Sequence, residues 1–145
     1  MSPKASILEK YNAFKLSNFE ICASVLALIL LLQLTGFIVQ KFYFVDVNDG
    51  LFFGLYGNNF ISIMLSVTLL AVLYFFREKF GFLIIFIAGG AISNIVDRLI
   101  YGGSIDYIAI GNFPVFNLAD IFITTGCFVS VLFIASGPYK KSPRQ

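Results

Sequence analysis

Two polar pairs with the same spacing interrupt an apolar sequence. "GGAISNIVDRL" closes one apolar run with Asn94 and Asp97, and "VFNLADIF" opens another with Asn117 and Asp120. Residues three apart share a face of a helix, so each pair sets an amide beside a carboxyl group. If the two runs form helices that pack together, the two aspartates face each other at one depth.

Two carboxyl groups at one site can act as base and acid together. Both cannot ionise comfortably, so one pKa rises and the pair holds one proton. The ionised member can take a proton from an attacking water while the protonated member hydrogen-bonds a peptide carbonyl oxygen. The chain has no histidine, which excludes a Ser-His-Asp triad and a histidine metal site. The pairs predict an aspartic peptidase with Asp97 and Asp120 as catalytic residues.

A structural role for these aspartates is the alternative. Asp120 could be an ordinary first-turn acid favoured by the helix dipole, and Asp97 could pair with its neighbour Arg98. Ionisable groups at membrane depth are usually functional, and the repeated pair favours function over capping.

Composition assigns the chain to a membrane. Of its 145 residues, 59% are hydrophobic and 12% are charged, against roughly 25% charged in soluble domains. A membrane-spanning helix needs about 20 mostly apolar residues. Four apolar runs predict transmembrane helices over about 19–39, 60–76, 80–97 and 120–136, in a single membrane-embedded peptidase domain, 1–145. The first run is too long for the core of a signal sequence, so a retained helix is expected.

Basic residues predict the orientation of these helices. They gather before the first run, between the second and third, and after the fourth: Lys4, Lys10, Lys15, Arg77, Lys79, Lys140, Lys141 and Arg144. By the positive-inside rule both termini are cytoplasmic, and segments 40–59 and 97–120 face outward with the aspartates. The net charge of +2 reflects this topology, so no nucleic-acid partner is expected. Cys22 and Cys127 are expected to pack inside spans.

The outward segments carry the signs of extended structure. Residues 41–57 alternate in polarity and reach a turn at Asn48-Asp49-Gly50, which predicts a short β-hairpin. Residues 104–110 also look extended between glycines. Such backbone is unsatisfied in hydrocarbon, so both segments should lie on the outer membrane surface. The predicted fold is an all-α integral membrane protein with four transmembrane helices and a small outer-face β-hairpin or sheet element.

The same residues resemble lipoprotein signal peptidase, the signal peptidase II family. The resemblance rests on "GGAISNIVDRLIYGGSIDY", "FNLADI" and "NDGLFFG", and it covers nearly all of the chain except its N-terminal segment. It implies a bacterial inner-membrane endopeptidase that removes the signal peptide from diacylglyceryl-modified prolipoproteins, cleaving before the lipidated cysteine. It also implies no cofactor, a monomer, and prolipoproteins and membrane lipids as partners.

The resemblance adds further site residues to the dyad. Five residues fall on motif positions that support the dyad or bind substrate: Asn48, Asn94, Arg98, Asp106 and Asn117. Phe53, Phe113 and Phe116 are candidates for lining the cleft. Many members carry an aspartate in the first span and a lysine four residues later, where this chain has Gln33 and Phe37, and Phe52 replaces a small residue. Gln33 is expected to hydrogen-bond a neighbouring helix.

Two other functions fit the same pattern. Asp97, Asp120, Asn94 and Asn117 could supply oxygen ligands to a cation in a transport component. A non-catalytic membrane binding protein could keep the fold as a binding surface.

Overall fold

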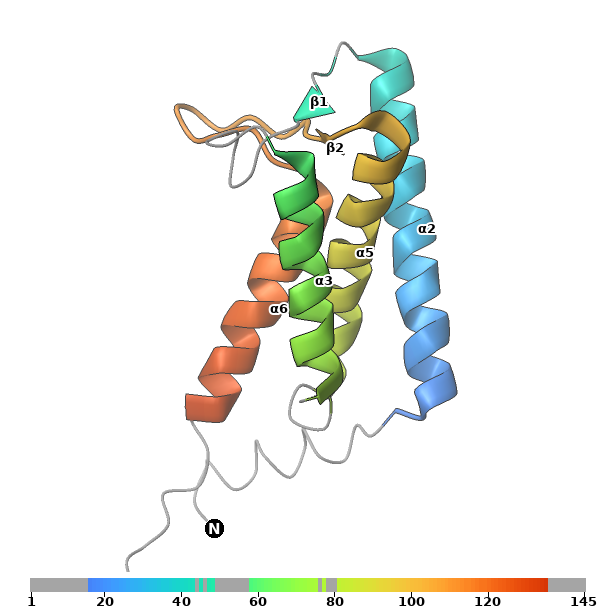
Figure 1. Cartoon of the computed structure of the whole chain (residues 1–145), viewed down its shortest axis with the longest axis vertical. Coiled ribbons are helices and arrows are strands. Elements are labelled where there is room, and N and C mark those ends of the chain that lie inside the picture. The colour runs from blue at the N-terminus through green and yellow to red at the C-terminus, as the bar shows by residue number, and fades with distance from the viewer. Residues whose placement is uncertain are drawn as a thin grey trace, which may run out of the picture.

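The fold is a bundle of helices with a small sheet at one end. A computed structural model describes residues 16–43, 45, 47–48, 58–75, 77 and 81–135. The helices run side by side along the long axis, and both strands lie at the same end of the bundle (Figure 1). The elements are α2 (Asn18–Phe42), β1 (Val47–Asn48), α3 (Asn59–Phe75), α5 (Leu83–Tyr101), β2 (Ser104–Ile105) and α6 (Leu118–Ala135).

Each of the four predicted spans is confirmed as a helix. α2 and α5 are long and apolar enough to cross a membrane, and α3 and α6 are shorter apolar helices. The main difference lies at α5, which runs on through Asp97 and Arg98 to Tyr101 and stops at Gly102. Gly102 has a φ of 79°, a left-handed conformation that glycine adopts at helix ends without a steric cost. Four complete passes and the orientation stay predictions, and Lys79 and the basic residues near both termini lie outside the described residues.

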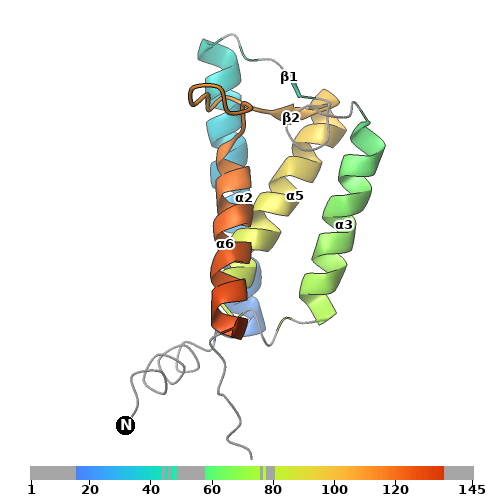
Figure 2. The ribbon, with the colours of Figure 1, turned by 90° about the vertical axis from the view of Figure 1, so that its left-hand side faces the viewer.

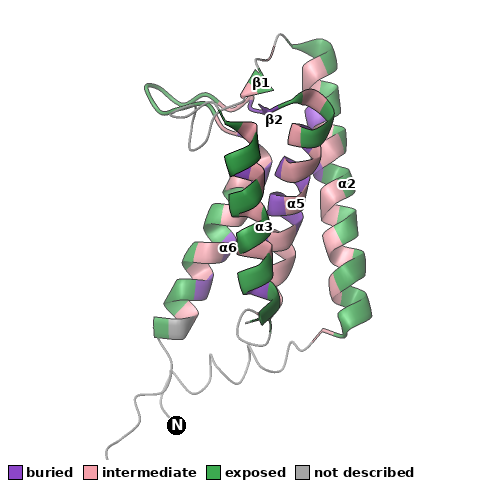
Figure 3. Cartoon of the chain, in the orientation of Figure 1, coloured by how far each residue is buried: buried purple, intermediate pink, exposed green. Residues whose placement is uncertain are grey.

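α5 is the central helix of the bundle. It packs against α6, α2 and α3, and a view at right angles to the first shows it passing between α2 and α3 (Figure 2). Its buried residues run along most of its length: Leu83, Ile87, Gly89, Gly90, Ala91, Ser93, Asn94 and Asp97. α2, by contrast, buries only Leu32 and Gly36 among its residues. The outer faces of the other helices are largely exposed (Figure 3), and many of the exposed side chains are large and apolar, as in a bundle surrounded by lipid.

Small residues bring α5 and α6 close together. A Cβ atom added at Gly90 would lie 2.7 Å from the carbonyl oxygen of Ala119. One added at Gly126 would lie 2.5 Å from Cγ1 of Ile87. Close approach of backbones at small residues is the usual basis of helix packing in membranes. It brings Asp120, the residue after Ala119, against α5.

The sheet pairs segments that are far apart in the sequence. β1 runs antiparallel to β2, with Val47 opposite Ile105 and Asn48 opposite Ser104. Val47 and Asn48, which were predicted to lie in a local hairpin, therefore pair with the second outward segment instead. The rest of the predicted turn, Asp49 and Gly50, lies outside the described residues. The extended structure predicted over 104–110 is confirmed in β2 and in a bridge from Ile108 to Phe116.

Candidate active site

Three aspartates gather at the sheet end of the bundle. Asp97 comes from α5, Asp106 directly follows β2, and Asp120 lies in the first turn of α6. Asp97 and Asp106 are each 7% exposed. Burying a carboxylate is costly unless hydrogen bonds or opposite charges compensate it, so the partners of each group indicate its role.

Asn117 and Asp120 together begin α6. The Oδ1 atom of Asn117 accepts the N–H of Asp120 at 3.0 Å, and the Oδ2 atom of Asp120 accepts the N–H of Asn117 at 3.1 Å. This reciprocal arrangement is a capping box, built here from Asn and Asp. The free oxygen of Asp120 crosses to α5, where Oδ1 accepts from Nδ2 of Asn94 at 2.8 Å. The Asn-x-x-Asp spacing therefore ends up serving both the helix start and the contact between helices.

Asn117 also links Asp120 to Asp106. Its Nδ2 atom donates to Oδ1 of Asp106 at 2.9 Å and to Oδ1 of Asn94 at 3.1 Å. The other oxygen of Asp106 accepts from Nδ2 of Asn48, in β1, at 2.7 Å. Burial raises the pKa of Asp106, the hydrogen bond from Asn48 opposes that rise, and the charge of Asp120 adds to it. Asn117 is thus a common partner, with its side chain donating to the Asp106 carboxylate and its backbone N–H to the Asp120 carboxylate.

Asp97 has a different set of neighbours. Its Oδ1 atom accepts from Nε2 of Gln33, on α2, at 2.8 Å. The backbone N–H of Ile105, in β2, also interacts with the Asp97 carboxylate. Residues three apart on a helix are about 60° apart around its axis, enough here for Asn94 to contact α6 while Asp97 contacts α2. The predicted hydrogen bond of Gln33 to a neighbouring helix is confirmed.

Arg98 supplies positive charge to the cluster. Its Nη1 atom donates to the carbonyl of Asn94 at 3.2 Å, and its guanidinium interacts favourably with the charges of Asp120, Asp106 and Asp97. Its Nε atom is buried without a hydrogen-bond partner among the described residues. In the same part of the chain, no group of three or more acidic or cysteine side chains is arranged to hold a metal ion.

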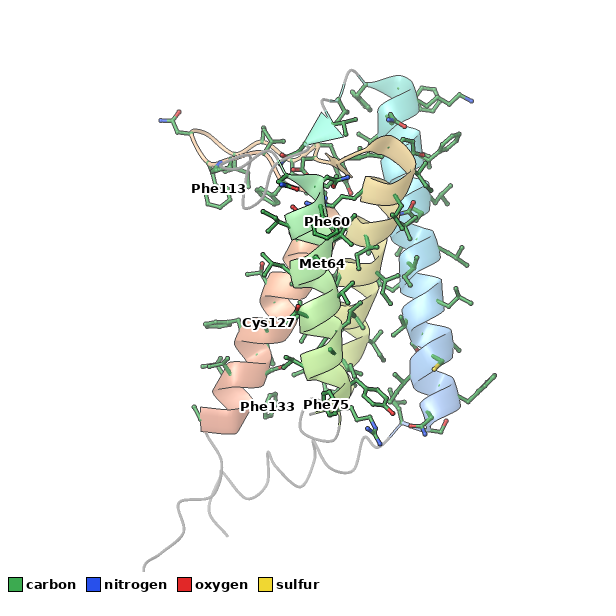
Figure 4. All side chains as sticks on the ribbon, viewed as in Figure 1. Phe60, Met64, Phe75, Phe113, Cys127 and Phe133 are labelled. Atoms are coloured by element: carbon green, nitrogen blue, oxygen red, sulfur yellow. The ribbon has the colours of Figure 1, made fainter. Side chains whose placement is uncertain are left out.

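Most of the predicted site residues meet at this end of the molecule. Asp97, Asp120 and all five predicted supporting residues belong to the contacts given above. Phe113 and Phe116 stack edge to face with ring centroids 5.7 Å apart, and Phe113 and Phe60 flank this end (Figure 4). Phe37 is 53% exposed on α2, and Phe52 and Phe53 lie outside the described residues.

Three contacts of the site were missed from the sequence. Asn59, at the start of α3, donates to the carbonyl of Arg98 at 3.1 Å, and the Tyr107 hydroxyl accepts the N–H of Leu118 at 3.4 Å. Ser93 accepts from Gln33 through both its carbonyl and its hydroxyl oxygen. Asn58 and Asn59 before an apolar run are typical of a helix start, which was the available signal for α3. Tyr107 and Ser93 carried no such pattern.

A bundle of apolar helices with buried, amide-linked carboxyl groups at one end defines a membrane protein with a candidate carboxylate active site. A model of the family described as signal peptidase II matches residues 29–136. The chain belongs to the signal peptidase II family.

Individual relatives agree with this assignment. The lipoprotein signal peptidase of Caldicellulosiruptor bescii is 36% identical over 107 residues, which are 70% of this chain and 71% of that protein. Those of Chlamydia felis and Syntrophomonas wolfei are 36% and 40% identical, over 58% and 60% of this chain. In these two alignments the chain spans 59% and 63% of the relative's length. A solved bacterial membrane enzyme shares the fold with a TM-score of 0.71 at 21% identity, covering 90% of this chain and 98% of its own.

Proposed function

We propose that the protein is a membrane aspartic endopeptidase that removes signal peptides from lipid-modified prolipoproteins, with Asp106 and Asp120 as its catalytic pair. The signal peptidase II family and its lipoprotein signal peptidase members support the substrate class. The observation that carries the catalytic assignment is the side chain of Asn117, which hydrogen-bonds Asp106 and caps the backbone of Asp120 while that carboxylate accepts its N–H.

The partner of Asp120 is where this proposal departs from the pairing predicted from sequence. Asp97 was the expected partner, but its carboxylate accepts from Gln33 of α2. The carboxylate of Asp106 accepts from the side chain of Asn117, and that of Asp120 accepts from the backbone N–H of the same residue. A pair that shares one proton needs electrostatic coupling, and the charge of Asp120 acts on both Asp106 and Asp97, so the contacts through Asn117 are what distinguish the two candidates. The contacts therefore favour Asp106 over Asp97.

The proposed reaction uses the pair as acid and base. Burial raises the pKa of Asp106, which favours Asp106 as the member that carries the shared proton. Asp120 then takes a proton from a water molecule while the water oxygen attacks the scissile carbonyl carbon. Asp106 donates a hydrogen bond to the carbonyl oxygen as negative charge develops there. Asn94 and Asn117 hold the carboxylates in place, and Arg98 offsets the negative charge of the cluster.

The position of the pair suits a lipid-anchored substrate. The proposed topology has four passes, cytoplasmic termini and a site at the outer face of a bacterial inner membrane. The acyl chains of a diacylglyceryl group would stay in the bilayer while the peptide reaches the carboxyl groups. The protein is proposed to act as a monomer without a cofactor. For the cation-binding alternative, the described part of the chain offers no group of three or more acidic or cysteine side chains arranged to hold a metal ion.

Cleavage of a diacylglyceryl-modified prolipoprotein by the purified protein in detergent tests this proposal. Wild type should cut before the lipidated cysteine, and Asp106→Asn and Asp120→Asn should each abolish cleavage while remaining folded. Asp97→Asn is the matched variant and should retain measurable turnover. Substantial turnover by Asp106→Asn, together with complete loss in Asp97→Asn, would restore the pairing of Asp97 with Asp120.

A further inference from the structure

Gln33 is a polar residue in the middle of an apolar helix. It lies on α2, and its Nε2 atom is 2.8 Å from Oδ1 of Asp97, 3.1 Å from Oγ of Ser93 and 3.2 Å from the carbonyl oxygen of Ser93. An amide nitrogen carries two hydrogens, so it can serve these three acceptors only by sharing. The shortest contact is the one to the carboxylate, where a charged acceptor makes the bond stronger.

Asp97 contacts both Gln33 and the strand β2. The backbone N–H of Ile105, in β2, interacts with the Asp97 carboxylate. Ile105 is 2% exposed and directly precedes Asp106. A carboxylate that holds the backbone of one residue restricts the side chain of the next. Asp97 therefore lies between a helix and the segment that carries a proposed catalytic carboxyl group.

Backbone contacts hold the same segment from its other side. Gly103 lies so close to β1 that an added Cβ would be 2.6 Å from the carbonyl oxygen of Asn48. Ser104 pairs with Asn48 in the sheet, and the amide of Asn48 reaches past it to Asp106. The sheet thus fixes one side of the segment, and Asp97 contacts Ile105 from α5.

We propose that Gln33 and Asp97 form a positioning latch, in which the amide of Gln33 holds the Asp97 carboxylate against the backbone of Ile105 and so fixes the orientation of Asp106. This role rests on the proposed function, because it acts through Asp106. It assigns Asp97 to positioning and leaves acid-base catalysis to the other two aspartates. It also gives α2 a direct part in the geometry of the site.

The latch predicts a specific kind of defect. Without the Gln33 donor, a buried carboxylate on α5 loses its side-chain partner and rotates toward another donor, leaving Ile105. Asp106 then keeps its bonds to Asn48 and Asn117 but loses the fixed backbone next to it. A misplacement of the order of 1 Å in a reacting group can cost about 10²-fold in rate. A hydrogen bond that only joined two helices would instead affect folding and leave the turnover of the folded protein unchanged.

The test uses Gln33→Met, Asp97→Asn and the double variant in the full-length protein in detergent. Gln33→Met keeps the length of the side chain and removes its donors. Thr35→Val is the control, since Thr35 is half-buried on the same helix and, among the described residues, donates only to the carbonyl of Leu31. Two quantities are measured in each variant: the kcat and KM for a diacylglyceryl-modified prolipoprotein peptide, and amide hydrogen exchange over residues 103–107.

The latch predicts a fall of about 10- to 100-fold in kcat for each single variant, with KM nearly unchanged and faster exchange at Ile105. The double variant should lose no more than the worse single variant, because both changes break one unit. Wild-type kcat in Gln33→Met overturns the latch, and so does a lower kcat with unchanged exchange at 103–107. If wild type cleaves nothing, the proposed function fails separately, and unchanged exchange in Gln33→Met would still overturn the latch.

Discussion

Replacing Gly90 by alanine tests whether the spacing of α5 and α6 sets the geometry of the site. The added Cβ would lie 2.7 Å from the carbonyl oxygen of Ala119 and 2.8 Å from Cγ1 of Ile123. Ordinary contacts of this kind begin at 3.4 Å, so the two atoms must separate by the difference, about 0.7 Å. The nearer atom belongs to the backbone, so α6 itself has to move.

That movement reaches the proposed catalytic pair because Asp120 follows Ala119. The bond from Asn94 to Asp120 is 2.8 Å long, and a shift of about 0.7 Å along it would bring the atoms to the limit of a hydrogen bond. We expect Gly90→Ala to lower kcat by about 10- to 100-fold. Overpacking should destabilise the fold by about 1–3 kcal/mol, of which about 0.5–1 kcal/mol is offset by the better helix propensity of alanine.

Gly36→Ala is the matched control for this experiment. Gly36 is also buried inside a helix, but a Cβ there would meet Cδ1 of Ile105 at 3.7 Å, an ordinary van der Waals distance. It gains the same propensity without the clash and should keep nearly wild-type kcat. Steady-state kinetics on the prolipoprotein peptide and thermal unfolding in the same detergent measure both effects. Wild-type kcat in a folded Gly90→Ala protein would refute the claim that this helix spacing positions Asp120.

Three further predictions concern the proton, the cap and the topology. Turnover should fall as pH rises through the raised pKa of Asp106. Asn48→Leu removes a hydrogen bond that lowers this pKa, so it should move the falling limb of the kcat/KM profile to higher pH. A shift of that limb to lower pH contradicts this. Asn117→Ala should lose about 1 kcal/mol of stability, because the helix cap is lost, and nearly all turnover. Asn117→Ser keeps a capping oxygen and should recover stability alone, because it lacks the amide that donates to Asp106. Recovery of both stability and turnover would argue against this role of the amide. A cysteine placed by Asn112→Cys in the loop between β2 and α6 should react with a membrane-impermeant maleimide added to intact cells, and labelling only after lysis would reverse the proposed orientation.

The helices were predictable from sequence because their cause is local. A run of about 20 apolar residues without charge is enough to specify a membrane helix, and the four predicted runs correspond to α2, α3, α5 and α6. The start of α6 has an equally local cause, since a capping residue and its partner three positions later are near neighbours in sequence, but the helix was predicted to begin at about 120 and begins at Leu118. Asn117 and Asp120 form that cap.

The sheet and the proposed catalytic partner of Asp120 depend on contacts between distant segments. Asn48 has a turn sequence after it, but its strand partner is Ser104, and nothing in residues 41–57 specifies that register. Asp106 lies in irregular structure after β2, where no helical periodicity applies. Helical spacing could therefore pair only Asp97 with Asp120. It gave no information on Asp106, which hydrogen-bonds Asn117 as Asp120 does.

The same contacts explain why this end of the bundle can hold buried acids at all. Asn117 satisfies a helix start, an amide on α5 and a carboxylate in the loop with one side chain. Each of these bonds compensates part of the cost of burying a polar group, so the cap of α6 and the proposed catalytic pair depend on one another. Loss of the Asn117 side chain should then affect folding and chemistry together, while loss of the Gln33 donor, one helix away, should lower turnover through the position of Asp106.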